Sequence, residues 1–240
     1  MNAIIALLAI ISSIISANAA VTEKEFQDVS REFVKFIVPF GQRWNPSYNR
    51  SIKLVTDPQF GAFASEPITV NTGLINDRSM SKDGLALVLC HEVGHNVDLA
   101  RFALGGTLVY GFGHLEQDYF AVHACLFPYF HSTADIFPGV VTEPEQIPRT
   151  LFTRCQSFGS EEGIRDCQRA IRAAQKLTDG VYEYFQRQLP SGNLPRPSFS
   201  REWLGPRDEL QARLLNFVNG IFGDAPFARK TSAPVSAHPI

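Results

Sequence analysis

Two histidines and a glutamate with the spacing of a metal site lie close together in one apolar stretch of the chain. His91 and His95 are four residues apart, so in a helix both imidazoles lie on one face about one turn apart, which suits two adjacent positions of a tetrahedral zinc ion. Glu92 lies beside them, where its carboxylate can exchange protons with water without having to ligate the metal. Burying three unpaired ionisable side chains for packing alone would be costly. These residues therefore predict a zinc site with Glu92 as its acid–base group, rather than two core histidines and a surface glutamate.

These residues need a buried helix beneath them and other elements around it. Residues 83–101 are predicted as that helix, because apolar side chains surround most of its circumference. A second helix is expected at residues 114–126, after a glycine-rich connection and ending before Pro128. The expected fold class is α+β, with a small sheet packed on the active-site helix and additional helices around it. Apolar periodicity and turn residues predict the remaining elements: helices at 23–38 (capped near Thr22), 161–187 (with Gly180 a possible interruption) and 207–218, strands at 51–55 and 68–75, and an extended linker at 189–198.

The two ends of the chain are expected to lie outside the folded domain. Residues 1–20 form an apolar run that ends in small residues, and Ala17-Asn18-Ala19 fits a signal-peptidase site, so residues 1–19 are predicted to be a signal peptide. No Lys or Arg precedes the apolar stretch, and an uncleaved membrane anchor is the alternative. Residues 224–240 lack periodicity and are expected to be disordered. The predicted domain therefore spans residues 20–223.

The cysteines and the charge narrow the class of protein further. Four cysteines in an exported chain suggest two disulfides: Cys155–Cys167 is the expected local pair, and Cys90–Cys125 follows by elimination. Four free buried thiols are the alternative for a chain that is not exported. None of the spacings is C-x-x-C, so a cysteine zinc site is not expected. The formal net charge of -2 gives no electrostatic reason to expect nucleic acid or an anionic membrane surface as a partner.

Three segments between Ile68 and Cys125 carry a resemblance to a known family. They are ITVNTGLI at 68–75, DGLALVLC at 83–90 leading into HEVGH, and DYFA at 118–121 followed by Cys125. This run resembles a group of exported bacterial gluzincin-type zinc metallopeptidases, enzymes with an HExxH motif that are related to the CAAX-prenyl protease clan. It covers about a quarter of the chain. Further along, LQARL at 210–214 is similar to a C-terminal Gln-x-Arg segment of the same group.

The resemblance also indicates the rest of the zinc site. Catalytic zinc usually has three protein ligands, and position 98 is Asp and position 101 Arg, which excludes the metzincin pattern. Asp118 matches the family's aspartate, which accepts a hydrogen bond from a ligand histidine. Where the family has its zinc-binding Glu, one turn earlier, this chain has His114. Glu116 is the alternative ligand, pointing about 200° away from His114 in a regular helix, and a site with impaired ligation is the third possibility.

The expected protein is a zincin-like metalloendopeptidase that hydrolyses peptide bonds of exported or extracellular proteins in the periplasm or outside the cell. Its cofactor is Zn²⁺, its partner is a peptide or protein substrate, and it has no membrane contact once the signal peptide is removed. The strand at 68–75 is expected to pair with the substrate backbone. A non-catalytic exported zinc-binding homologue, acting as a binding or structural module, is the alternative. Several residues are candidate donors to the oxyanion of the transition state: His131, Tyr182, Tyr184 and Arg213.

Overall fold

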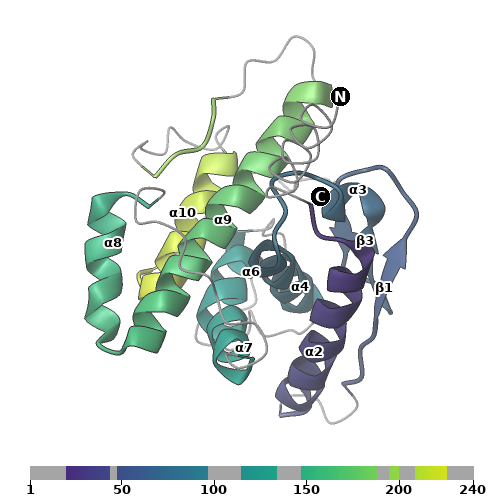
Figure 1. Cartoon of the computed structure of the whole chain (residues 1–240), viewed down its shortest axis with the longest axis horizontal. Coiled ribbons are helices and arrows are strands. Elements are labelled where there is room, and N and C mark those ends of the chain that lie inside the picture. The colour runs from purple at the N-terminus through teal and green to yellow at the C-terminus, as the bar shows by residue number, and fades with distance from the viewer. Residues whose placement is uncertain are drawn as a thin grey trace, which may run out of the picture.

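Helices make up most of the fold, and a small sheet lies to one side of them (Figure 1). The computed structural model describes residues 20–43, 48–96, 115–133, 147–188, 195–199 and 209–225. Helix α4 (Lys82–Asn96) is central: α2 (Glu23–Gln42) and the sheet lie on one side of it, and α9 (Glu161–Gln188) and α10 (Glu209–Phe222) lie on the other. The predicted α+β class is confirmed.

The sheet has three short strands in the order β1-β3-β2. β1 (Ile52–Val55) runs parallel to β3 (Ile68–Asn71), with Ile52 opposite Ile68. β2 (Ala62–Phe63) pairs with the other edge of β3 in the antiparallel direction. Because β3 is paired along both edges, the prediction that this strand receives the substrate backbone is wrong.

The predicted strand at 68–75 is also too long. The chain leaves the sheet after Asn71 and forms one helical turn, α3 (Thr72–Ile75). The carbonyl oxygen of Asp57 accepts hydrogen bonds from the Thr72 hydroxyl and the Gly73 amide, each 2.8 Å long. These two bonds hold the chain in the turn, so the strand ends four residues before the apolar pattern does.

Helix α2 begins where the sequence predicts and ends later. Thr22 caps it in a capping box: the Thr22 hydroxyl accepts from the amide of Glu25, and the Glu25 carboxylate accepts from the amide of Thr22. The predicted end at residue 38 is wrong, because the helix passes through Pro39 to Gln42. Proline removes one backbone hydrogen bond, while the stacked rings of Phe36 and Phe40, 5.6 Å apart, add packing on both sides of it.

Helix α4 is more buried than α2. Leu85, Leu87 and Leu89 of α4 have no exposed surface, and α4 contacts α2, α6, α9 and β2. A helix that is apolar nearly all round must be covered on every side. The predicted end of this helix at residue 101 lies outside the described residues, which stop at Asn96.

A continuous helical stretch follows in three parts: α6 (Leu115–Phe120), the π-helical η2 (Ala121–Leu126) and α7 (Phe127–Ser132). The prediction that this helix ends before Pro128 is wrong. The π-helical register before Pro128 changes the hydrogen-bond pattern, and Pro128 falls in the first turn of α7, where a missing amide is tolerated.

Both predicted disulfides are present, Cys90–Cys125 and Cys155–Cys167. The second one joins α9 to α8 (Arg149–Cys155), a short helix that the sequence did not reveal and that the 3₁₀ turn η4 (Gln156–Phe158) follows. Gly180 does not interrupt α9; a β-carbon at that position would collide with the Ser79 hydroxyl, so glycine allows a close approach. Helix α10 extends to Phe222, beyond the predicted end at residue 218.

None of the helices within the described ranges is both long and apolar enough to cross a bilayer. The predicted signal peptide at residues 1–19 and residues 226–240 of the predicted tail lie outside those ranges.

Candidate metal centre

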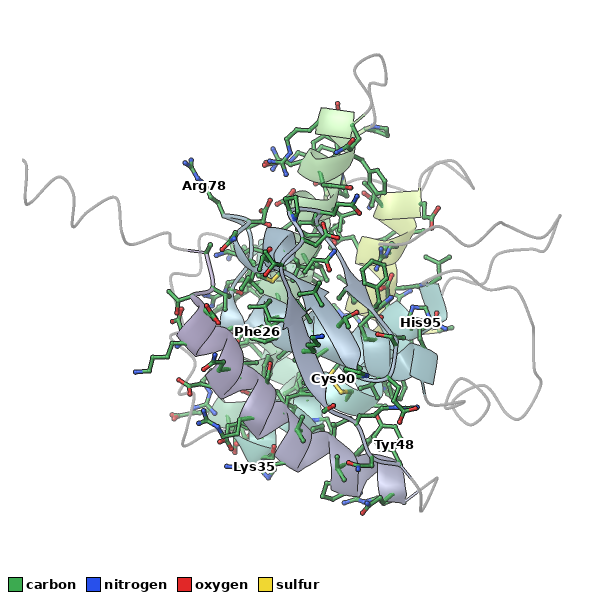
Figure 2. All side chains as sticks on the ribbon, turned by 90° about the vertical axis from the view of Figure 1, so that its right-hand side faces the viewer. Phe26, Lys35, Tyr48, Arg78, Cys90 and His95 are labelled. Carbon is green, nitrogen blue, oxygen red and sulfur yellow. A yellow bond between two sulfur atoms is a disulfide. The ribbon has the colours of Figure 1, made fainter. Side chains whose placement is uncertain are left out.

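The two histidines of α4 face each other as the helical spacing predicts. Nε2 of His95 lies 3.1 Å from Nε2 of His91, and their rings are 4.8 Å apart and nearly perpendicular. Two nitrogens bound to one tetrahedral zinc at about 2.0–2.1 Å are roughly 3.4 Å apart. The two imidazoles therefore present their ring nitrogens at a separation that a single metal ion can bridge. Figure 2 shows His95 on the side of the molecule away from Phe26 of α2.

Asp118 of α6 fixes the orientation of the His91 ring. Nδ1 of His91 lies 2.8 Å from Oδ1 of Asp118, and both side chains are buried. A carboxylate can only accept, so this contact favours the tautomer that carries the proton on Nδ1. Nε2 of His91 is then left with its lone pair, the form that binds a metal. His91, Glu92, His95 and Asp118 are called the candidate metal centre below.

Arg213 of α10 holds the carboxylate of Asp118 from the other side. Its Nε and Nη2 donate to Oδ2 and Oδ1 of Asp118 at 2.8 and 2.9 Å, a bidentate pair within the core. Burial by itself would raise the pKa of Asp118, but the charge of Arg213 and the contact with His91 outweigh it and lower that pKa to about 2. Asp118 is thus ionised at neutral pH and remains an acceptor.

The electrostatics around His95 favour its neutral form. The residue as a whole is exposed, yet its Nε2 lies beside the buried His91. Desolvation of the ring and then the proximity of His91 lower the pKa of His95 to about 3. A neutral imidazole is the state in which histidine ligates a metal.

Glu92 has the properties expected of a general base. It is 2% exposed, and within the described part of the chain its Oε1 has no hydrogen-bond partner. Burial raises the pKa of Glu92 above its usual range, and the proximity of His91 and the charge of Arg213 only partly oppose this effect. An orphaned oxygen in the core is costly unless another group binds there. A metal-associated water molecule is such a group, so the donor set and this orphan oxygen fit a zinc site.

The two predicted candidates for the third ligand are His114 and Glu116. His114 lies outside the described residues, and of Glu116 only the backbone is described. Within the ranges that the structure covers, no group of three His, Cys, Asp or Glu side chains converges on one point. Helix α10 nevertheless fixes the start of α6, because the buried Asn216 side chain donates to the carbonyl of Leu115 at 3.1 Å. The predicted ligand assignment, His114 or Glu116, stays a prediction.

The four candidate oxyanion donors each have another partner. Nδ1 of His131 lies 3.0 Å from Glu162 on the surface. Tyr182 lies beneath the guanidinium of Arg196, and the Tyr184 ring packs on Phe60. Of these four residues, Arg213 contacts the candidate metal centre, and its guanidinium donates two hydrogen bonds to Asp118.

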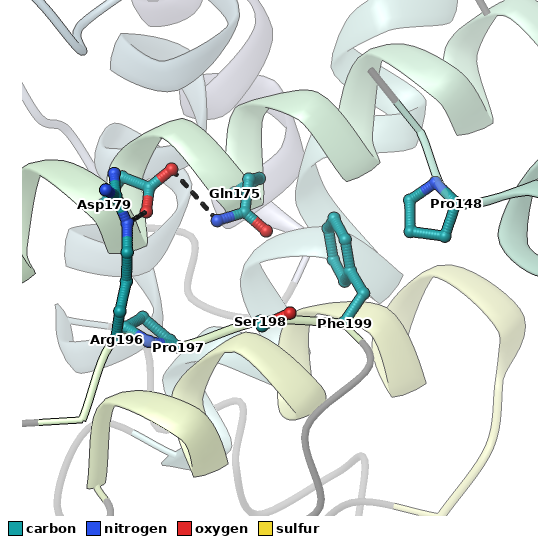
Figure 3. A pocket seen from close by; sticks show the side chains of 7 residues that line it. All are labelled: Pro148, Gln175, Asp179, Arg196, Pro197, Ser198 and Phe199. Atoms are coloured by element: carbon teal, nitrogen blue, oxygen red, sulfur yellow. Dashed lines mark hydrogen bonds and ion pairs between the residues drawn. The ribbon is translucent and has the colours of Figure 1, made fainter. Parts of the chain in front are cut away.

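The structure also contains a cavity away from the candidate metal centre. A cavity of about 370 Å³ opens between α9 and the segment at 195–199, with the Phe199 ring on one wall (Figure 3). Its charged groups are paired with each other: Arg196 donates to Asp179 at 3.0 Å, and Gln175 donates to the same carboxylate at 3.0 Å. No residue of the candidate metal centre lines this cavity.

Sequence reasoning missed the contribution of α10. Gln211, Arg213 and Asn216 are buried polar residues in this helix, and two of them hold α6. Gln211 exchanges two hydrogen bonds of 2.9 Å with the backbone of Ser198, which fixes the extended segment against the helix. The signal was available as polar residues at positions 211, 213 and 216 among apolar neighbours, but their partners are far away in the sequence.

Comparison with known families adds independent support for peptidase chemistry. The model of Peptidase family M48 matches residues 23–101, a third of the chain, which include His91, Glu92 and His95 but not Asp118 or Arg213. No curated protein and no solved structure matches the chain. The matched segment supports a metallopeptidase family for this protein, and with it a hydrolase that acts on peptides or proteins.

Proposed function

We propose that the chain is a zinc-dependent metalloendopeptidase that hydrolyses peptide bonds of exported or extracellular proteins. One observation supports this best: Nε2 of His91 and Nε2 of His95 approach to 3.1 Å while Nδ1 of His91 lies on Asp118. The family match supports a metallopeptidase. The identity of the metal as zinc, cleavage within chains and the exported substrates belong to the proposal.

His91, His95 and His114 would hold the metal, with Glu116 as the alternative to His114. Zinc bound there supplies Lewis-acid chemistry, which polarises the scissile carbonyl and lowers the pKa of water. Glu92 takes a proton from the attacking water and then delivers it to the leaving amine, a task that suits a buried carboxylate whose pKa is raised. Asp118 and Arg213 hold His91 so that its Nε2 faces the metal position.

The test of this mechanism is Glu92→Gln. The variant should keep about one zinc per chain, measured by elemental mass spectrometry, and lose about 10²–10⁴-fold in peptide cleavage. Glu161→Gln, on the exposed first turn of α9, is the matched control and should keep full activity. Peptidase activity retained by Glu92→Gln would contradict the proposed role.

A non-catalytic zinc-binding module is the second candidate, favoured by His114 standing where the resembled family has its ligand Glu. Mixed peptide libraries separate the two, since a binding module shows no metal-dependent cleavage at any bond. Comparing zinc affinity in His114→Ala and Glu116→Ala identifies the third ligand. A mature chain that binds no zinc even after incubation with it would contradict the proposal that the protein is a zinc-dependent peptidase.

Location outside the cytoplasm is part of the proposal. It is supported by the apolar N-terminal run with Ala17-Asn18-Ala19 and by the two disulfides, which persist in oxidising compartments. Intact-mass measurement of the native protein should show that residues 1–19 are removed. A native protein that retains them would favour the membrane-anchor alternative.

A further inference from the structure

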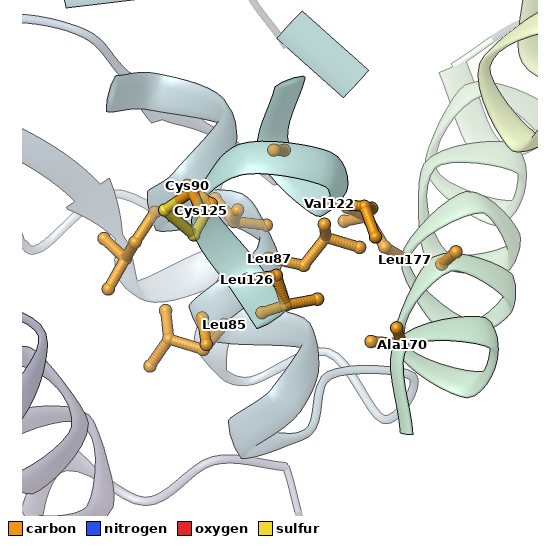
Figure 4. Close-up of a cluster of buried hydrophobic side chains, with 14 of the residues drawn as sticks. Leu85, Leu87, Cys90, Val122, Cys125, Leu126, Ala170 and Leu177 are labelled. Carbon is orange, nitrogen blue, oxygen red and sulfur yellow. A yellow bond between two sulfur atoms is a disulfide. The ribbon is translucent and has the colours of Figure 1, made fainter. Parts of the chain in front are cut away.

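The Cys90–Cys125 disulfide joins the two helical stretches that carry the candidate metal centre. Cys90 immediately precedes His91 in α4, and Cys125 lies in η2, seven residues after Asp118. The two Cα atoms are 5.6 Å apart, and both side chains are fully buried. Figure 4 shows the bridge between the two ribbons, within the cluster of buried apolar side chains.

The same two helices are also in close contact one turn further along α4. A β-carbon at Gly94 would lie 3.0 Å from Cδ1 of Phe120 and 3.3 Å from Cγ of Gln117. Cys90 and Gly94 are four residues apart, so they lie on the same face of α4. This face therefore meets α6 and η2 through a covalent bridge at one turn and a glycine contact at the next.

The polar contact between these helices demands accurate placement. Nδ1 of His91 and Oδ1 of Asp118 are 2.8 Å apart, and a displacement of the helices by about 1 Å would take the pair beyond hydrogen-bond distance. Metal sites tolerate deviations of only about 0.2 Å in ligand distances. A bridge one residue from His91 restricts the displacement that would open this contact.

We propose that the Cys90–Cys125 disulfide positions His91 on Asp118 and thereby sets the metal affinity of the centre, in addition to stabilising the fold. The part of this inference that concerns the metal rests on the proposed function. The part that concerns the His91–Asp118 hydrogen bond is a property of the metal-free protein.

The second disulfide is a matched control. Cys155 and Cys167 are also fully buried, with Cα atoms 5.6 Å apart, and they join α8 to α9. No residue of the candidate metal centre lies on either of these helices. Removing this bridge should therefore lower stability without reaching the centre.

The experiment compares Cys90→Ala/Cys125→Ala with Cys155→Ala/Cys167→Ala. Alanine is used instead of a reducing agent because free thiols are themselves zinc ligands. The first measurement is the NMR signal of the His91 Nδ1 proton in the zinc-free protein, and the second is zinc affinity by competition with a chelator. We expect Cys90→Ala/Cys125→Ala to lose the proton signal and to bind zinc on the order of 10-fold more weakly. Cys155→Ala/Cys167→Ala should keep both properties while its thermal midpoint falls.

A His91 signal and zinc affinity unchanged in folded Cys90→Ala/Cys125→Ala overturn the proposal, as does a wild-type chain that lacks the signal. If the alanine pair does not fold, Cys90→Val/Cys125→Ala, which refills part of the space of the sulfurs, is measured in its place. Failure of both pairs to fold, while Cys155→Ala/Cys167→Ala folds, also contradicts it, because the bridge would then support the whole core. A wild-type chain that shows the signal but binds no zinc disproves the proposed function, and the NMR comparison alone then decides the positioning role.

Discussion

Two arginine–aspartate pairs with a buried guanidinium share nearly the same geometry in this molecule. In one, Arg213 of α10 donates to Asp118 at 2.8 and 2.9 Å; in the other, Arg169 of α9 donates to Asp83 at 3.0 and 2.8 Å. Asp83 belongs to the first turn of α4, and Asp118 belongs to α6. Both pairs therefore join one of the helices α9 and α10 to one of the helices that carry the candidate metal centre.

The surroundings of the two carboxylates differ. The Asp118 side chain has no exposed surface and also accepts from His91, whereas the Asp83 side chain is 29% exposed and lies in the first turn of α4, eight residues before His91. Arg169 has further partners, with Asp166 at 3.3 Å and the Phe130 ring beneath its guanidinium. The same ion-pair chemistry thus anchors a helix at one end of α4 and orients a candidate ligand at the other.

The largest expected effect comes from removing one charge from each pair. Asp118→Asn leaves Arg213 buried without its counter-ion, so we expect the free energy of unfolding to fall by about 3–5 kcal/mol. Zinc affinity should fall by about 10–100-fold, because His91 loses its carboxylate partner. Asp83→Asn is the matched change: Arg169 keeps Asp166, and the expected loss is about 1–3 kcal/mol with unchanged zinc affinity. Urea unfolding and chelator competition measure both, and equal zinc affinities in the two variants would refute the distinction.

The next effect is a dependence of stability on acid. The pKa of Asp118 is lowered from its usual value of 3.8 to about 2, so its contribution is complete above pH 4 and is lost as the pH falls toward 2. The lowering corresponds to about 2 kcal/mol. Unfolding free energies measured for the metal-free protein between pH 5 and pH 2 should fall more steeply in the wild type than in Asp118→Asn. Parallel curves for wild type and Asp118→Asn would show that Asp118 is not the group responsible.

The smallest expected effect concerns Glu92, a buried carboxylate whose Oε1 has no hydrogen-bond partner among the described residues. Burial raises the pKa of Glu92, so this group favours the folded state when protonated and weakens it as the pH rises through its folded pKa. Glu92→Gln should therefore raise the unfolding free energy of the metal-free protein above that pH, by about 0.5–2 kcal/mol. The measurement is urea unfolding at pH 5 and pH 8 with a chelator present. If Glu92→Gln is no more stable than the wild type at pH 8, other groups in the fold compensate the cost of burying the ionised Glu92 carboxylate.

Local patterns predicted the parts of this fold that depend on near neighbours. The Thr22 capping box, α9 with its 28 residues and the helical spacing of His91 and His95 follow from residues within a few positions of one another. The errors occur where distant contacts override the pattern. Asp57 turns the chain out of β3 early, and α8 is a short helix that a disulfide to α9 supports. Isolated helices of that length are marginal in water.

The candidate site divides in the same way. An i, i+4 pair with an intervening glutamate fixes which atoms of α4 face one another, since helix geometry alone sets their positions. Asp118 was found through its resemblance to a family motif, but its partner Arg213 lies 95 residues away and was assigned a different possible role. That pairing depends on how α10 packs on α6, which no local pattern encodes.

The sequence by itself determined the chemistry available on α4 and the α+β class, and it limited the four cysteines to three possible sets of pairs, because these depend on residue type, helical periodicity and the number of cysteines. Only the tertiary structure decided that β3 is closed to a substrate strand, that Arg213 keeps the Asp118 carboxylate ionised, and that Cys90 ties His91 to the helix of its hydrogen-bond partner. Each of these is a contact between residues far apart in the chain, which packing of the core brings together.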